Sequence, residues 1–61
     1  MTDQEVDELA AILVLEHGKA ACQVAEDRRL LHESGSDAFR LWTRIAAAVA
    51  RLLRLKQHAS T

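Results

Sequence analysis

The stretch Ser34-Gly35-Ser36-Asp37 is the one place where the sequence predicts a reversal of the chain. Glycine accepts the positive φ that commonly ends a helix, so Gly35 can close the segment before it. Ser36 can cap a following helix, and Asp37 adds negative charge at the positive end of that helix's dipole. We therefore predict a turn over residues 34–36 between two helical segments.

The composition is that of a small helical domain. The chain has 61 residues, no proline, two glycines and one cysteine, and it is rich in Ala, Leu, Arg and Glu. These are strong helix formers. A chain of this length forms at most one domain, residues 1–61, and buries only about 60 % of its unfolded surface. Since a lone Cys22 cannot form an internal disulfide, we expect oligomerisation to add stability.

The segment before the turn predicts one long helix over about residues 3–33. Thr2-Asp3-Gln4-Glu5 matches a capping box, in which the Thr hydroxyl accepts a bond from the Glu backbone N–H. From Val6 onward, apolar residues recur with the alternating four-three spacing of a bundle helix. The segment Leu9 to Leu15 is apolar on nearly every side and needs cover from more than one direction.

A second helix is predicted over about residues 37–57, with Leu41, Ile45 and Val49 on its apolar face. The expected fold is all-α, an antiparallel helical hairpin. Its arms are unequal, because 31 residues span about 46 Å and 21 residues about 31 Å. A second chain that covers the overhang would give a homodimeric four-helix bundle. The predicted interface consists of Leu9, Ile12, Leu13, Val14, Gly18 and Trp42.

An alternative is a three-helix bundle in which the chain breaks at Gly18 and residues 3–17 fold back. A new helix after Gly18 would want a capping side chain, but Lys19 and Ala20 supply none and continue the helical pattern. The sequence therefore favours the continuous helix over the break.

The order Leu15-Glu16-His17-Gly18, Gly35-Ser36-Asp37 and Trp42-Thr43-Arg44-Ile45-Ala46 resembles a family of short, uncharacterised bacterial helical proteins. An Asp often follows the His-Gly pair in that family, whereas Lys19 and Ala20 follow it here. The resemblance implies a bacterial source, and because no activity is known for the family it does not point to any activity here. The length and hairpin plan also resemble the Rop-type RNA-binding hairpins, which dimerise into four-helix bundles, but this similarity is architectural.

Charge is divided between the two predicted arms. Residues 1–34 hold eight carboxylates and three basic side chains, while residues 35–61 hold one carboxylate and five basic side chains. Basic residues form one stripe on the second helix: Arg40, Arg44, Arg51 and Arg54. The stripe is either a solvated face neutralised by carboxylates of the first helix, or a surface for nucleic-acid phosphates. We favour the first reading because the stripe has no aromatic residue for base stacking.

Neither catalysis nor a cofactor or metal is expected. His17 and His32 have no His, Asp or Glu three or four residues away on the same helix face, which a helical metal site needs. We therefore interpret His17 as a partly buried structural residue. Cys22 lacks a base and an orienting group, so it reads as a small hydrophobic residue.

The leading functional hypothesis is that the chain is a non-catalytic interaction or regulatory protein that self-associates and contacts protein partners. The alternative is a Rop-like RNA- or DNA-binding hairpin that uses the arginine stripe. The acidic start differs from a secretory signal, and no apolar run approaches the roughly 20 residues of a membrane span. With a free cysteine, these features predict a cytoplasmic protein that does not enter a membrane.

Overall fold

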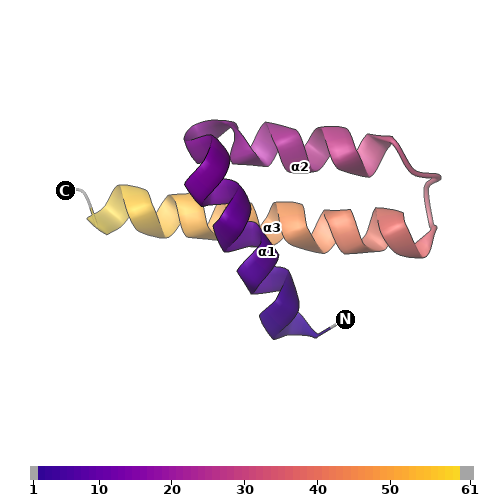
Figure 1. The fold of residues 1–61 in the computed structure, drawn as a ribbon, viewed down its shortest axis with the longest axis horizontal. Helices are drawn as coiled ribbons and strands as arrows, with labels where there is room; N and C mark the ends of the chain where they lie inside the picture. Colours follow the sequence, from indigo (N-terminus) through magenta and orange to yellow (C-terminus); the bar gives the residue numbers. More distant parts are fainter. Residues whose placement is uncertain (1, 60–61) are drawn as a thin grey trace.

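The computed structural model describes residues 2–59, and this part of the chain contains helices and no strand. In chain order the elements are α1 (Asp3–His17), a 3₁₀ turn η1 (Gly18–Ala20), α2 (Ala21–Leu30) and α3 (Asp37–Ala59). In Figure 1, α2 and α3 lie side by side and antiparallel, and α1 crosses over α3. The predicted all-α class and the hairpin around the turn are therefore confirmed.

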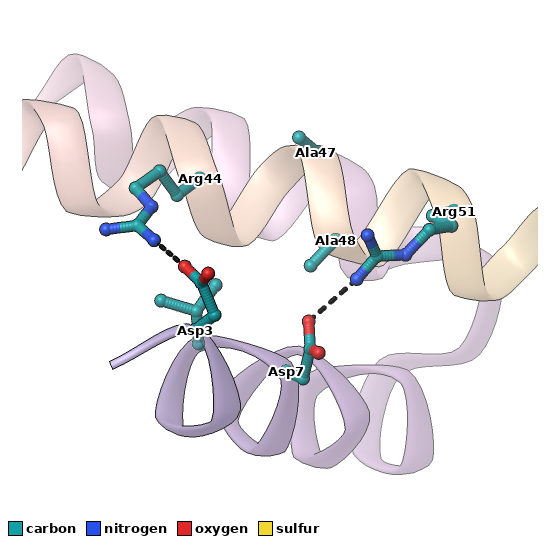
Figure 2. Close-up of a pocket in the computed structure, with 7 residues that line it drawn as sticks. Asp3, Asp7, Arg44, Ala47, Ala48 and Arg51 are labelled. Atoms are coloured by element: carbon teal, nitrogen blue, oxygen red, sulfur yellow. Dashed lines mark hydrogen bonds and ion pairs between the residues drawn. The ribbon is translucent and has the colours of Figure 1, made fainter. Parts of the chain in front are cut away.

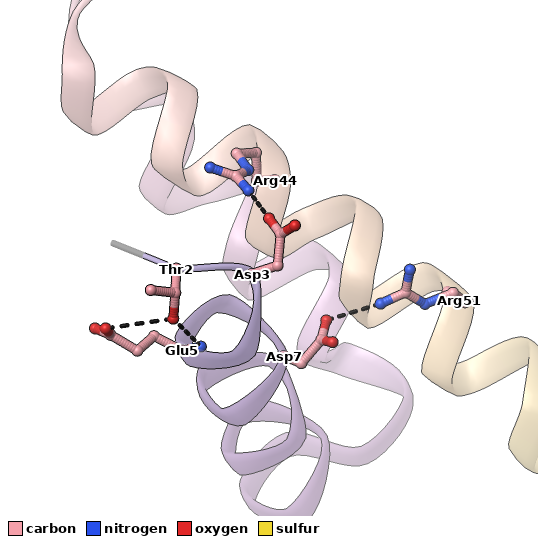
Figure 3. A network of polar contacts seen from close by, with 6 residues as sticks. All are labelled: Thr2, Asp3, Glu5, Asp7, Arg44 and Arg51. Atoms are coloured by element: carbon pink, nitrogen blue, oxygen red, sulfur yellow. Dashed lines mark hydrogen bonds and ion pairs between the residues drawn. The ribbon is translucent and has the colours of Figure 1, made fainter.

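The N-terminus of α1 forms as the capping box predicts. The backbone N–H of Glu5 donates to the Thr2 hydroxyl at 3.2 Å, and Thr2 has the extended backbone of an N-cap. The Glu5 carboxylate also accepts a hydrogen bond from that hydroxyl, at 3.4 Å (Figure 3). The cap fixes the start of α1 at Asp3.

The turn around Gly35 also has the predicted chemistry. Gly35 has a φ of 88°, and the Ser36 hydroxyl accepts a bond from the backbone N–H of Phe39 at 3.1 Å. The helix before it ends at Leu30, earlier than the predicted residue 33. The N–H groups of Leu31 and His32 donate to carbonyls three residues back, which is the hydrogen-bond pattern of a 3₁₀ turn. The α-helix therefore ends in this tighter turn. α3 begins at Asp37, as predicted.

The prediction of a continuous helix over residues 3–33 is wrong, because the chain breaks at Gly18. Gly18 has a φ of 58° and a ψ of −129°, a conformation that side chains with a Cβ disfavour. Its N–H still bonds to the Val14 carbonyl and closes α1. The structure thus shows the break that was the alternative, and it forms without any capping side chain at η1 or α2.

Burial of α1 explains why the break wins over the missing cap. Folding back at Gly18 lays α1 on α3 and buries Val6, Ala10 and Val14. Removing such apolar side chains from water is worth roughly 1 kcal/mol or more each, which is comparable to the typical value of a helix cap. The overhang expected from the unequal arms does not exist in this arrangement.

Small side chains dominate the core. Among the residues that the structure describes, the largest fully buried side chains are Ile45 and Val49. Larger residues, including Trp42 and Leu52, are only partly buried at its edge. The molecule extends 39, 22 and 16 Å along its principal axes. In the described part of the chain the buried residues are Val6, Ala10, Val14, Ala21, Ala25, Ile45, Ala46, Ala48 and Val49.

α3 is the longest element and carries both α1 and α2 on its apolar side. Arg44, Arg51 and Arg54 of α3 are exposed. Within the described residues, no helix is long and apolar enough to cross a membrane.

Candidate interaction surface

Three large apolar side chains lie exposed on one side of α1. Leu9, Ile12 and Leu15 are 37, 49 and 83 % exposed, and their three-residue spacing forms one ridge along the helix. We call this ridge the outer face of α1. It points away from the buried side, which packs on α3 through Val6 and Ala10.

The predicted interface residues divide into two groups. Leu9 and Ile12 are exposed on the outer face. Val14 is buried in the chain's own core, and Leu13 and Trp42 are partly buried against it. Gly18 forms the bend. The structure therefore brings only part of the predicted set to a free surface, because folding back of α1 uses the rest internally.

Four exposed leucines were not part of the predicted interface. They lie at the end of the outer face of α1, where α2 ends, and on α3. Leu15 is the most exposed large apolar side chain, and its position in the all-round apolar Leu9 to Leu15 segment was the available signal. Leu30 and Leu31 are 69 and 76 % exposed where α2 ends, and Leu55 is 60 % exposed on α3. The early end of α2 explains Leu31, which the seam of a longer helix would have buried.

Two ion pairs connect the first turns of α1 to α3. Arg44 donates to the Asp3 carboxylate, and Arg51 donates to the Asp7 carboxylate at 2.7 Å (Figures 2 and 3). All four side chains are largely exposed, so each pair contributes about 1 kcal/mol or less to stability. The two pairs instead align the helices, because they determine which turns of α1 lie opposite which turns of α3.

A shallow groove of about 460 Å³ lies between these ion pairs. Val6 and Ala48 lie along it, and Ala48 points toward α1 whereas Ala47 points away (Figure 2). The groove has no buried polar group of its own in the described part of the chain. It is a seam between packed helices with charged edges.

The arginine stripe is partly neutralised within the chain. Arg44 and Arg51 pair with carboxylates of α1, as the solvated-face reading expected. Arg40 and Arg54 are exposed, and neither forms an ion pair with another described residue. The positive charge available to an outside partner is therefore smaller than the sequence alone suggests.

A third charged contact joins α2 to the start of α3. The guanidinium of Arg29 lies 5.5 Å from the centre of the Phe39 ring, and it also donates to Glu26 at 3.1 Å. A cation over an aromatic face is worth roughly 0.5–1 kcal/mol at such sites. Phe39 is half-buried by this contact and supports the hairpin beside the turn.

The histidines and the cysteine form no reactive cluster among the described residues. No group of three or more His, Cys, Asp or Glu side chains is placed to hold a metal ion there. Cys22 is free and half-buried against the core. The partly buried position predicted for His17 is wrong: it is exposed because α1 ends there, and its Nε2 lies 3.9 Å from the neighbouring Glu16 carboxylate.

Comparison of the chain with protein-family models, with curated proteins and with solved structures finds no match.

Proposed function

We propose that this protein is a small, non-catalytic interaction protein that self-associates through the outer face of α1 and acts through protein–protein contacts. The observation that carries the proposal is the reversed distribution of side-chain size. Apart from Ile45, the buried residues of the described chain are alanine and valine, while six leucine and isoleucine side chains are exposed. Covering a large aliphatic side chain is worth about 1.5–3 kcal/mol, so a partner gains most by binding where these residues cluster.

The outer face suits a second copy of the same chain. If two α1 helices pack antiparallel about a twofold axis at Ile12, each Ile12 faces its equivalent and each Leu9 faces Leu15 of the other copy. Such a contact is self-complementary, as a symmetric dimer requires. The same axis sets Glu8 opposite Glu16, which weakens the contact and keeps it reversible.

Sedimentation of the purified chain over a range of concentrations tests the proposal. The chain is expected to form dimers, and Ile12→Lys is expected to raise the dissociation constant by at least tenfold, since each dimer loses two buried isoleucines. Ala11→Lys is the matched control, because it places the same charge on an exposed residue of α1 beside the ridge. A monomer at every concentration, or equal effects of the two variants, contradicts the proposal.

Nucleic-acid binding through Arg40, Arg44, Arg51 and Arg54 is a second candidate with weaker support. The observation that supports nucleic-acid binding is that all four side chains are exposed on α3. The pairing of Arg44 and Arg51 with α1 carboxylates counts against it. Salt-dependent binding to RNA or DNA that Arg40→Glu with Arg54→Glu abolishes would support this candidate. Absence of any salt-dependent binding would remove it.

A further inference from the structure

The bend between α1 and α2 depends on one residue. His17, Ala20 and Ala21 have backbone angles in the helical region, whereas Gly18, with its positive φ, departs from it. Rotation at Gly18 alone into the helical region would join α1, η1 and α2 into one helix over residues 3–30, about 42 Å long. Nothing lies within 4 Å of a Cβ built on Gly18, so packing does not hold the bend closed from that side.

Straightening has a local gain and a local cost. The last carbonyls of α1 and the first N–H groups after Gly18 would become partners in one continuous helix. The gain is larger here because no side chain caps η1 or α2. The cost is that α1 loses its packing on α3. Its contact with α2 is also lost, but that contact is the smaller of the two.

A second copy of the chain can restore the lost packing, because its α3 offers α1 the same contacts. We propose that this chain exchanges α1 between two copies by straightening at Gly18, so that α1 of each copy packs on α3 of the other. The contacts recovered are the burial of Val6, Ala10 and Val14 and the ion pairs of Asp3 with Arg44 and Asp7 with Arg51. Exchange of an identical element across a hinge is a low-cost route to a dimer.

Complementary charges on α1 and α3 indicate which surface of the second copy receives α1. Asp3 and Asp7 on α1 each pair with an arginine on α3, so an α1 released from one copy finds the same binding surface on α3 of another copy. This inference shares with the proposed function only the need for a second copy. The outer face with Leu9, Ile12 and Leu15 takes no part in the exchanged contact.

Two hinge variants test the exchange in opposite directions. Gly18→Ala makes the bent conformation unfavourable and is expected to shift each chain toward the straight form by roughly tenfold, and the dimer constant by more. Lys19→Pro removes a helical N–H and obstructs a continuous helix, so it is expected to keep α1 on the α3 of its own chain and to prevent the exchange. Lys19→Ala, at an exposed position, is the control. A Gly18→Ala chain that stays monomeric overturns the exchange.

Complementary charge reversal tests which contacts are exchanged. In the Gly18→Ala background, one variant carries Asp3→Arg with Asp7→Arg, and the other carries Arg44→Asp with Arg51→Asp. Each alone opposes like charges at the α1–α3 seam, whereas a mixture restores both seams by exchange. The mixture is expected to form one-to-one heterodimers in clear excess over the homodimers of either variant.

The matched control pair changes the net charges equally but away from the seam, with Asp27→Arg and Glu33→Arg in one chain and Arg40→Asp and Arg54→Asp in the other. All four control positions are exposed. Heterodimers from the seam pair but not from the control pair support the exchange. Equal heterodimer formation by both pairs, or none from the seam pair, overturns it. If Ile12→Lys dimerises no more weakly than Ala11→Lys while the seam pair still exchanges, the exchange stands and the proposed outer-face contact fails.

Discussion

Arg51 on α3 donates a hydrogen bond to Asp7 on α1 at 2.7 Å, across 44 residues of sequence. Together with the pair of Arg44 and Asp3, it aligns the two helices without contributing much energy, because the side chains are exposed. The fold is therefore held by small-residue packing along the helices and by two glycines at its bends.

The Asp7–Arg51 pair is expected to show weak coupling. In a double-mutant cycle with Asp7→Asn and Arg51→Gln, the interaction free energy from urea unfolding should be about 0.2–1 kcal/mol. It should fall as salt is added, since exposed charges are screened. The same cycle on Asp7 and Arg54, which form no pair, is the control. A coupling well above 1 kcal/mol that is insensitive to salt would contradict this account.

The alanine core predicts sensitivity to added volume. Ala10 is fully buried between helices, so Ala10→Leu should lower the free energy of unfolding by about 1–3 kcal/mol through overpacking. Ala11→Leu makes the identical change at the neighbouring exposed position and should alter stability by less than about 0.5 kcal/mol. Thermal and urea unfolding of the two variants compare them directly, and equal effects would argue against close packing at Ala10.

Ser36 and Ser34 offer a matched pair at the turn. Ser36 accepts the Phe39 N–H, so Ser36→Ala should cost about 0.5–2 kcal/mol of unfolding free energy. Ser34→Ala, two residues earlier and exposed, should be nearly neutral. Urea unfolding measures both. If Ser34→Ala proves as costly as Ser36→Ala, the loss does not come from the helix cap.

The two glycines show what the sequence predicts and what it leaves out. At Gly35 the cap, the dipole charge and the break in apolar periodicity all agree, so the turn and the start of α3 follow from local rules. At Gly18 the local rules favour a continuous helix, because Lys19 and Ala20 are good helix formers. The bend forms because it buries Val6, Ala10 and Val14 on α3, a tertiary term that no window around Gly18 contains.

The candidate surface shows the same division. The apolar Leu9 to Leu15 segment signalled that some α1 residues need outside cover, and Leu9 and Ile12 are indeed exposed. Which of them stay exposed depends on how α1 rotates against α3, and that rotation placed Val14 inside and Leu15 outside. The Arg44 and Arg51 pairs with α1 are long-range contacts, although the division of charge between the arms anticipated their sign.

The twofold outer-face contact makes a prediction about charge. In that arrangement Glu8 of one copy faces Glu16 of the other twice, so Glu16→Lys turns two repulsions into two attractions. Each change is worth several tenths of a kcal/mol at an exposed site, so the dimer should become roughly tenfold tighter at low salt. Glu33→Lys makes the same change of charge on an exposed residue away from α1 and should have little effect. Sedimentation equilibrium at low and high salt measures both variants. Because a general loss of negative charge would tighten the two dimers equally, only a gain confined to Glu16→Lys and weakened by salt supports antiparallel packing of α1 about Ile12.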